Sequence, residues 1–309
     1  MTNRVVITGM GGVSSIGMSV PEIYNSLREG KPGIGQLDFP DITRLKVKTG
    51  GQIKNFDPNK HFELKQVSRT DRFSQFALLA AKEAIANAGL ENCKEEWPEN
   101  AGVILGSSIG GIETINYSYK QVFEKGHDRL HPLTIPKIMN NSATSLISIE
   151  YHIQGPSFTI SSACSSANHA MGIAYETIKS GKSKILITGG SESFLSFGGI
   201  KPWESLRVLS QSKCRPFSRG RDGLVHGEGA GIFVFESLAS AKKRKADIIA
   251  EVVGFAMSSD ASDLIKPNNI GPQKALEGVL KDAMINKTDV AYINAHGTGT
   301  ILNDKVECE

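Results

Sequence analysis

Residues 158–168 read Phe-Thr-Ile-Ser-Ser-Ala-Cys-Ser-Ser-Ala-Asn, a β-rich run that leads into small residues with Cys164 at the junction. A predicted strand therefore passes directly into a predicted helix. Unpaired N–H groups of a first helical turn, together with the positive end of the helix dipole, favour an anion there. A thiol in this position is expected to have a lowered pKa, which suits a nucleophile. The alternative is an inert buried cysteine, and the strand–cysteine–helix order argues against it.

The predicted helix behind the cysteine is poor in charge. Residues 166–175 are mostly small and carry few charges. A helix without a polar face is predicted to be buried. We therefore expect the thiol of Cys164 at the floor of a site rather than on the surface.

Short β-rich apolar runs alternate with helical patterns along the chain. This alternation predicts an α/β fold with mostly parallel strands. Residues 31–65 lack a clear periodicity and are expected to form a surface excursion. The predicted strands are 4–8, 102–106, 157–161, 184–188, 232–236, 249–254 and 290–293. The predicted helices are 21–29, 71–88, 142–151, 166–180, 237–244 and 273–285.

Composition excludes several classes of protein. The 309 residues carry a net charge of +3, spread along the chain. The run Lys-Lys-Arg-Lys at 242–245 is expected to be a solvated helix end or the turn after it, so nucleic acid is not a predicted partner. No run of about eighteen apolar residues occurs, which argues against a membrane span.

The cysteines suggest a reducing compartment. Four cysteines are too few and too scattered for a disulfide framework, and their spacing does not fit a zinc site. We expect a cytoplasmic protein without a metal or an organic cofactor. The four are Cys93, Cys164, Cys214 and Cys308.

A second candidate site follows the predicted strand 290–293. Residues 294–300 read Asn-Ala-His-Gly-Thr-Gly-Thr, and ligands of open α/β sheets bind just past the carboxyl ends of strands. His296 can act as acid, base or donor there, although a structural turn histidine is the alternative. Asp304 and Glu307 stand three positions apart in a starting helix, where they are expected to cap it or hold neighbouring backbone.

Residues 221–231, Arg-Asp-Gly-Leu-Val-His-Gly-Glu-Gly-Ala-Gly, form a third glycine-rich segment. A dinucleotide loop follows a strand and opens a helix, whereas this segment precedes a predicted strand. We therefore expect a close-packed turn. No Gly-x-Ser-x-Gly sequence lies at a strand–helix junction, which gives acyl transfer through a serine little support.

The segments 161–167, 221–231 and 294–300, in this order and spacing, resemble β-ketoacyl-[acyl-carrier-protein] synthases of the elongation type. Residues 5–11 and 106–111 are similar to that family too, so the resemblance covers the whole chain. It implies an α/β, thiolase-like fold with αβαβα layers. Residues 1–252 would form the N-terminal half that carries the nucleophile, and residues 253–309 the start of the C-terminal half.

The chemistry implied by the resemblance is acyl transfer followed by a decarboxylative Claisen condensation that yields a 3-oxoacyl-[acyl-carrier-protein], in fatty-acid or polyketide-like synthesis. Cys164 would accept the acyl group, and His296 would assist decarboxylation and stabilise the developing oxyanion. Thr298 and Thr300 would contact the pantetheine arm. The implied partners are an acyl carrier protein and a second copy in a homodimer. The basic residues assigned to docking the carrier protein are Lys65, Arg69 and Arg207.

The sequence also departs from the family pattern. A Lys-Ser-x-x-Gly-His segment and a Gly-Phe-Gly turn are not found, so we expect an incomplete second half, in a fragment or a truncated product. Asp263 and Ile265 stand where elongation enzymes have a His and a Thr. This replacement suggests a specialised synthase that makes another acyl or polyketide chain.

Two rival functions are compatible with the sequence. One is a thiolase or an initiating synthase that uses coenzyme A thioesters, which the 221–231 and 294–300 segments disfavour. The other is a non-catalytic partner subunit of a true synthase. The presence of Cys164 argues against this second rival, and the missing C-terminal motifs argue for it.

Overall fold

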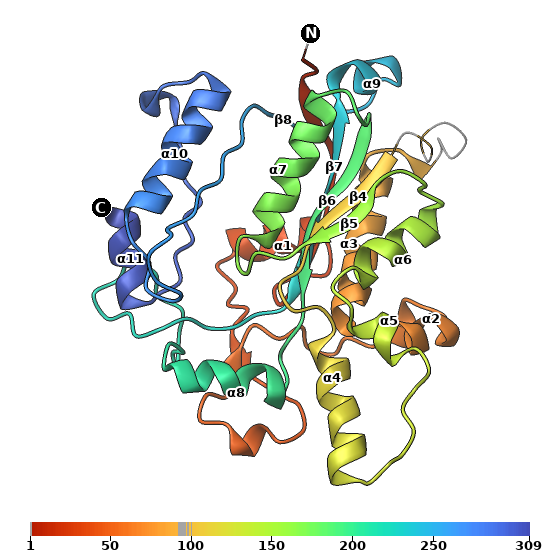
Figure 1. The fold of residues 1–309 in the computed structure, drawn as a ribbon, viewed down its shortest axis with the longest axis vertical. Helices are drawn as coiled ribbons and strands as arrows, with labels where there is room; N and C mark the ends of the chain where they lie inside the picture. The colour runs from red at the N-terminus through yellow and green to blue at the C-terminus, as the bar shows by residue number, and fades with distance from the viewer. Residues whose placement is uncertain (1, 92–96, 98, 100) are drawn as a thin grey trace.

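The computed structural model describes residues 2–91, 97, 99 and 101–309, so Cys93 lies outside the described residues. The chain folds around one central sheet with helices on both faces (Figure 1). The strands are β1 (Val5–Ser14), β2 (Gly35–Gln36), β3 (Thr49–Gly50), β4 (Ala101–Gly106), β5 (Ser157–Ile160), β6 (Ile185–Glu192), β7 (Gly229–Ser237) and β8 (Ala250–Val252). The α-helices are α1 (Val20–Arg28), α2 (Leu64–Arg69), α3 (Arg72–Asn87), α4 (Ile112–Tyr119), α5 (Thr134–Ile138), α6 (Ser142–Tyr151), α7 (Ser166–Lys179), α8 (Phe197–Leu206), α9 (Leu238–Lys243), α10 (Ile270–Ala283) and α11 (Ile301–Cys308).

The central sheet has six strands in the order β5-β4-β6-β7-β1-β8. β4 is parallel to β5 and β6, whereas β7 is antiparallel to β6 and β1, and β8 is antiparallel to β1. The expectation of mostly parallel strands is therefore wrong for half of the sheet. The register gives the reason: Glu192 at the end of β6 pairs with Gly229 at the start of β7. Residues 193–228 return the chain to the end of the sheet that it had just left, so β7 must run in the opposite direction.

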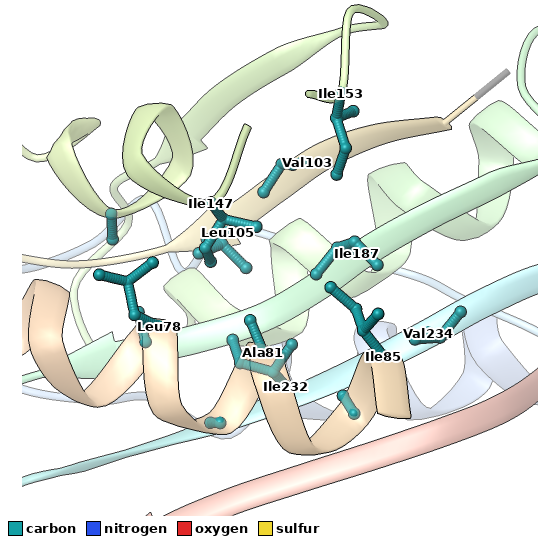
Figure 2. Close-up of a cluster of buried hydrophobic side chains, with 14 of the residues drawn as sticks. Leu78, Ala81, Ile85, Val103, Leu105, Ile147, Ile153, Ile187, Ile232 and Val234 are labelled. Atoms are coloured by element: carbon teal, nitrogen blue, oxygen red, sulfur yellow. The ribbon is translucent and has the colours of Figure 1, made fainter. Parts of the chain in front are cut away.

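Two apolar cores lie on the two faces of this sheet. Figure 2 shows the larger core, where helices α3 and α6 contribute Leu78, Ile85 and Ile147 against the side chains of β4, β6 and β7. On the opposite face, α7 covers β4 and β6 with Ala170, Ala174 and Ile178. The buried apolar side chains of α7 thus fix this helix on the sheet.

The segment 31–65 is less peripheral than expected. It forms the β2–β3 hairpin, and its Leu37 and Leu45 are buried against Leu195 and Ile200 of the segment that includes α8. These side chains form a small third core. The lack of a single periodicity reflects short elements and turns rather than an unpacked loop.

The predicted strand at 290–293 is wrong. These residues are extended without strand pairing, and the side chains of Tyr292 and Ile293 are exposed. A strand requires a hydrogen-bonding neighbour, and no other strand pairs with this segment among the described residues. The second sheet of the expected five-layer arrangement is likewise not formed within the described part of the chain.

Helix α10 lies beside α7 (Figure 1) and is joined to it by an ion pair between Lys179 Nζ and Asp282 Oδ1 at 2.8 Å. Asp282 also accepts a hydrogen bond from the N–H of Phe255 at 2.9 Å. These contacts attach residues 253–283 to α7. Among the residues that the structure describes, no helix is long and apolar enough to cross a membrane.

Candidate active site

Polar side chains gather where the parallel strands β4, β5 and β6 end. Carboxyl ends of parallel strands meet at one edge of a sheet, and here Ser108, Ser161 and Glu192 follow or end these three strands. Ser161 Oγ donates to the carbonyl oxygen of Ser108 at 3.1 Å. Glu192 accepts a hydrogen bond from the Ser108 N–H at 2.7 Å. Cys164 follows β5 at this same edge, so the nucleophile candidate lies where the fold places ligands.

A strained turn presents Cys164. Ala163 has a φ of +52°, a left-handed conformation that costs a residue with a side chain about 1–2 kcal/mol. Ser166 Oγ stabilises this turn, because it accepts from the Ser162 N–H at 2.9 Å and donates to the Ala163 carbonyl at 2.6 Å. A Cβ atom on Gly106 would lie 2.3 Å from the backbone nitrogen of Ala167. Glycine at 106 therefore lets the start of α7 approach the end of β4.

Cys164 lies at the mouth of helix α7. The helix begins at Ser166, and Ser165 occupies the N-cap position. Cys164 is exposed, so the expectation of a thiol at the floor of a buried site is wrong for this chain. The buried apolar side chains of α7 begin at Ala170, on the sheet, whereas Cys164 precedes the helix at the open edge.

The thiol of Cys164 lies beside the imidazole of His296 and interacts with it. This contact lowers the pKa of the Cys164 thiol and raises the pKa of His296. Partial burial and the negative charge of Glu192 act in the opposite direction on the thiol. The direction of the shift agrees with the expectation from sequence, but its largest cause is His296. A thiolate beside an imidazolium is the form that such a pair favours.

Two carboxylates of α11 hold the loop that carries His296. Glu307 accepts hydrogen bonds from the N–H groups of His296 at 2.6 Å and Gly297 at 2.7 Å. Asp304, only 2% exposed, accepts from the N–H of Gly299 at 3.1 Å and of Phe217 at 2.7 Å. The expectation that these two acids hold neighbouring backbone is confirmed.

The third glycine-rich segment packs against the same loop. The N–H of Gly223 donates to the carbonyl of Gly299 at 3.1 Å, and Arg221 Nε donates to the carbonyl of Thr300 at 3.4 Å. The hydroxyls of Thr298 and Thr300 are 2.8 Å apart and hydrogen-bonded to each other. All three segments singled out in the sequence therefore lie at or beside one site.

The basic residues proposed for docking do not form one cluster. Lys65 and Arg69 are exposed on α2, and Arg207 is exposed at the carboxyl end of α8. Figure 1 shows α2 and α8 on different sides of the molecule.

The run 242–245 was expected to be solvated. This expectation is wrong for one residue, because Arg244 forms an ion pair with buried Glu236 at 2.7 Å.

Several residues at the site were missed in the sequence. Glu192 and the hydrogen-bonded pair Ser162–His169 lie next to the nucleophile. Glu192 ends a strand, and a polar residue at the carboxyl end of a strand could have been recognised as a candidate site residue. The hydrogen bond of His169 could not be foreseen, because its partner Ser162 lies across the turn at Ala163. Within residues 2–91, 97, 99 and 101–309, no group of three or more His, Cys, Asp or Glu side chains is placed to bind a metal.

Comparison with known proteins gives consistent matches over the whole chain. Residues 2–241 match the family "Beta-ketoacyl synthase, N-terminal domain", and residues 249–309 match "Beta-ketoacyl synthase, C-terminal domain". Nodulation protein E of Rhizobium sp. (strain N33) is 42% identical over 309 residues, which cover 100% of this chain and 76% of the relative. The 3-oxoacyl-[acyl-carrier-protein] synthase 2 of Staphylococcus aureus (strain COL) is 38% identical, over 97% of this chain and 74% of the relative.

A solved structure described as the ishigamide ketosynthase/chain length factor superposes with a TM-score of 0.93 at 31% identity. The superposition covers 99% of this chain and 76% of that one. The predicted thiolase-like α/β fold is confirmed.

Proposed function

This chain belongs to the β-ketoacyl synthase family of condensing enzymes, and we propose that it is an acyltransferase that condenses an acyl group on Cys164 with malonyl-[acyl-carrier-protein]. The product is a 3-oxoacyl-[acyl-carrier-protein]. The observation that carries this proposal is that the His296 imidazole lies beside the Cys164 thiol and lowers its pKa. It couples a nucleophile to a proton donor at the carboxyl edge of the sheet.

In the first step, the Cys164 thiolate attacks the thioester carbonyl of the acyl carrier protein. The new sulfur–carbon bond forms as the pantetheine thiolate leaves, and the imidazolium of His296 supplies the proton that the leaving thiolate takes up. A thiolate with a lowered pKa is the correct starting form for this attack.

In the second step, malonyl-[acyl-carrier-protein] loses carbon dioxide. The electron pair of the broken carbon–carbon bond becomes an enolate, whose oxygen takes a hydrogen bond from His296. The enolate carbon attacks the acyl-Cys164 carbonyl, the carbon–sulfur bond breaks, and the Cys164 thiolate is regenerated. A proton from solvent restores the imidazolium of His296, which gave its proton to the pantetheine thiolate in the first step. Thr298 and Thr300, on the same loop as His296, are proposed to contact the pantetheine arm.

Docking of the carrier protein is proposed at Lys65 and Arg69 on α2, with Arg207 as a separate contact. Their exposed cationic side chains suit an acidic protein, and their separation predicts different effects on binding. Charge reversal at Lys65 and Arg69 together is expected to weaken binding more than charge reversal at Arg207. Surface plasmon resonance at two salt concentrations measures this difference.

We infer a homodimer that forms along β5. This strand is the edge of the sheet, and Phe158 on it is 41% exposed, so its free backbone groups and apolar side chain can pair with a second copy. Sedimentation equilibrium tests this inference. We expect the wild type to be a dimer and the Phe158→Lys variant to be a monomer. A wild type that is monomeric at micromolar concentration would contradict the inferred dimer.

We infer a specialised acyl or polyketide product rather than a housekeeping fatty acid. Asp263 and Ile265 occupy the positions where elongation enzymes have a His and a Thr. Asp263 Oδ1 accepts hydrogen bonds from the N–H groups of Ile265 and Lys266, both at 2.8 Å, so its carboxylate closes a turn. Mass spectrometry of products from a panel of acyl primers tests the inference, and a preference for the primers of ordinary fatty-acid elongation contradicts it.

The condensation is tested by mixing the chain with acyl-[acyl-carrier-protein] and malonyl-[acyl-carrier-protein] labelled in the carboxylate that is lost. Release of labelled carbon dioxide together with 3-oxoacyl product supports the proposal. Activity with coenzyme A thioesters alone points instead to a thiolase or an initiating synthase.

A non-catalytic partner subunit is distinguished by labelling with a thiol-directed acyl mimic. Selective modification of Cys164 over Cys93, Cys214 and Cys308 supports the enzyme. Uniform or absent labelling of the four cysteines supports the partner subunit. The Cys214→Ala variant is the control, because its labelling at position 164 is expected to be unchanged.

A further inference from the structure

His169 has no role in the proposed chemistry, yet its side chain is tied to the nucleophile. It lies in the first turns of α7, where its N–H donates to the carbonyl of Ser165 at 2.9 Å. Its imidazole Nδ1 is 2.7 Å from the hydroxyl oxygen of Ser162 and hydrogen-bonded to it. Ser162 is two residues before Cys164, on the other side of the strained turn at Ala163.

The hydroxyl of Ser162 also contacts the other side of this turn. Ser165 Oγ donates to the carbonyl of Ser162 at 2.7 Å and lies 3.3 Å from its hydroxyl oxygen. Residues 162 and 165 therefore close a small ring around Ala163 and Cys164. Ser166 attaches the backbone of this ring to the start of α7, and His169 attaches its Ser162 hydroxyl one turn further along the helix. Strain such as that at Ala163 persists only when surrounding contacts hold it.

The ring of His169 is itself held from outside. Phe255 packs edge-on against it, with ring centroids 6.4 Å apart and an interplanar angle of 82°. The Phe255 ring occupies the space beside Gly172, where a Cβ atom would lie 2.1 Å from the ring. The N–H of Phe255 is bound by Asp282, which is paired with Lys179. A continuous set of contacts thus runs from the segment after β8 to the turn that presents the thiol.

We propose that His169 is a positioning residue for the nucleophile: through Ser162 it holds the left-handed turn at Ala163, so that Cys164 Sγ stays beside His296. The packing of Phe255 fixes the imidazole and makes the position of the thiol depend on the contact between residues 253–256 and α7. This inference rests on the proposed role of Cys164, but its test does not require condensation.

The test is the pH profile of Cys164 alkylation by iodoacetamide, followed at the peptide that contains residue 164. The charged groups that face the thiol are His296, which favours the thiolate, and Glu192, which disfavours it. If the turn relaxes, the thiol loses contact with His296 and its titration midpoint rises. His169→Ala and Ser162→Ala are each expected to slow alkylation at neutral pH by about tenfold, the effect of losing one hydrogen bond.

Three further variants separate positioning from general damage to the fold. His169→Asn can still hydrogen-bond Ser162 and is expected to keep the wild-type midpoint. The double variant His169→Ala/Ser162→Ala is expected to match either single variant, because both remove the same bond. His127→Ala replaces an exposed histidine and is the matched control, which should leave the profile unchanged.

Superimposable alkylation profiles for the wild type, His169→Ala and Ser162→Ala would overturn the proposal. Additive effects in the double variant, or an Asn variant as impaired as the Ala variant, would also overturn it. If His169→Ala does not fold, Ser162→Ala decides the question alone, since it removes only a hydroxyl. An unshifted profile in a chain that still condenses substrates refutes the positioning role only, whereas shifted profiles without any acyl transfer refute the proposed function only.

Discussion

The thiol of Cys164 and the imidazole of His296 lie beside each other and interact, although the two residues are 132 positions apart in the chain. Cys164 is delivered by the turn between β5 and α7. His296 is delivered by a loop that α11 holds through Glu307. The contact shifts the pKa of each group toward the charged form, which prepares the thiol for attack on a thioester.

Removal of the imidazole should weaken the nucleophile. In His296→Ala the thiol loses the largest cause of its lowered pKa, so its pKa rises and the thiolate fraction at neutral pH falls. A fall of about tenfold or more is expected. Titration of the thiolate by its ultraviolet absorbance, with Cys93, Cys214 and Cys308 replaced by Ala, measures the shift. A midpoint equal to that of the parent variant contradicts the assignment of His296.

The carboxylate of Glu307 should matter through the position and charge of His296. Glu307→Gln keeps one acceptor oxygen but leaves one of the two backbone N–H groups of residues 296 and 297 without its side-chain partner. It also removes a negative charge that raises the pKa of His296. We expect slower acylation of Cys164. Because the pKa of His296 falls, the loss of acylation rate at alkaline pH should also begin at a lower pH than in the wild type. Glu277→Gln, an exposed site on α10, should change neither quantity.

The ion pair between Arg244 and Glu236 should be important for stability. Glu236 is fully buried, accepts from Arg244 at 2.7 Å and from the hydroxyl of Thr8 at 3.1 Å. Arg244→Met leaves a buried carboxylate unpaired and is expected to lower the free energy of unfolding by about 3 kcal/mol. Arg244→Met/Glu236→Gln should recover part of this loss. Urea unfolding measures the free energy of unfolding of both variants. Equal stability of the wild type and Arg244→Met would contradict the stabilising role of this ion pair.

His226 should make the protein less stable in acid. Its imidazole packs edge-on between Phe194 and Trp203, at centroid distances of 4.6 and 4.7 Å, and its Nε2 has no hydrogen-bond partner among the described residues. Burial lowers the pKa of His226 to about 4, from 6.5. Between these values the unfolded chain binds a proton that the folded chain does not, so stability is complete above pH 6.5 and falls as the pH falls toward 4.

The size of this acid effect is about 2–3 kcal/mol. The difference in unfolding free energy between the wild type and His226→Leu isolates it, because the other groups titrate in both proteins. We expect the unfolding free energy of the wild type to fall by about 2–3 kcal/mol relative to that of His226→Leu as the pH is lowered from 7 to 4. A pH-independent difference would show that His226 stays accessible to protons in the folded state.

The parts of the structure that follow from local sequence were predicted. The run 158–168 shows its strand and its helix directly, and the positions of Glu307 and Asp304 three residues apart indicate a shared face. The segments 161–167, 221–231 and 294–300 all lie at or beside the site. Their glycines allow close approach of backbone segments, and their hydroxyl groups form hydrogen bonds within the turns.

The parts that depend on distant partners were not predicted. The reversal of β7 depends on the path of residues 193–228, and the pairing of Arg244 depends on a carboxylate that β7 buries. The exposure of Cys164 depends on which side chains cover the edge of the sheet. Residues 290–293 would form a strand only beside a partner strand, and the described part of the chain provides none. None of these features leaves a signal within a short window of sequence.

The most direct test of the role of Cys164 is the mass of the chain after incubation with acyl-[acyl-carrier-protein] alone. We expect one added acyl group, mapped to the peptide that contains residue 164, and no addition in the Cys164→Ala variant. Acyl transfer that persists in Cys164→Ala, or an acyl group found on Cys214 or Cys308 instead, would contradict it.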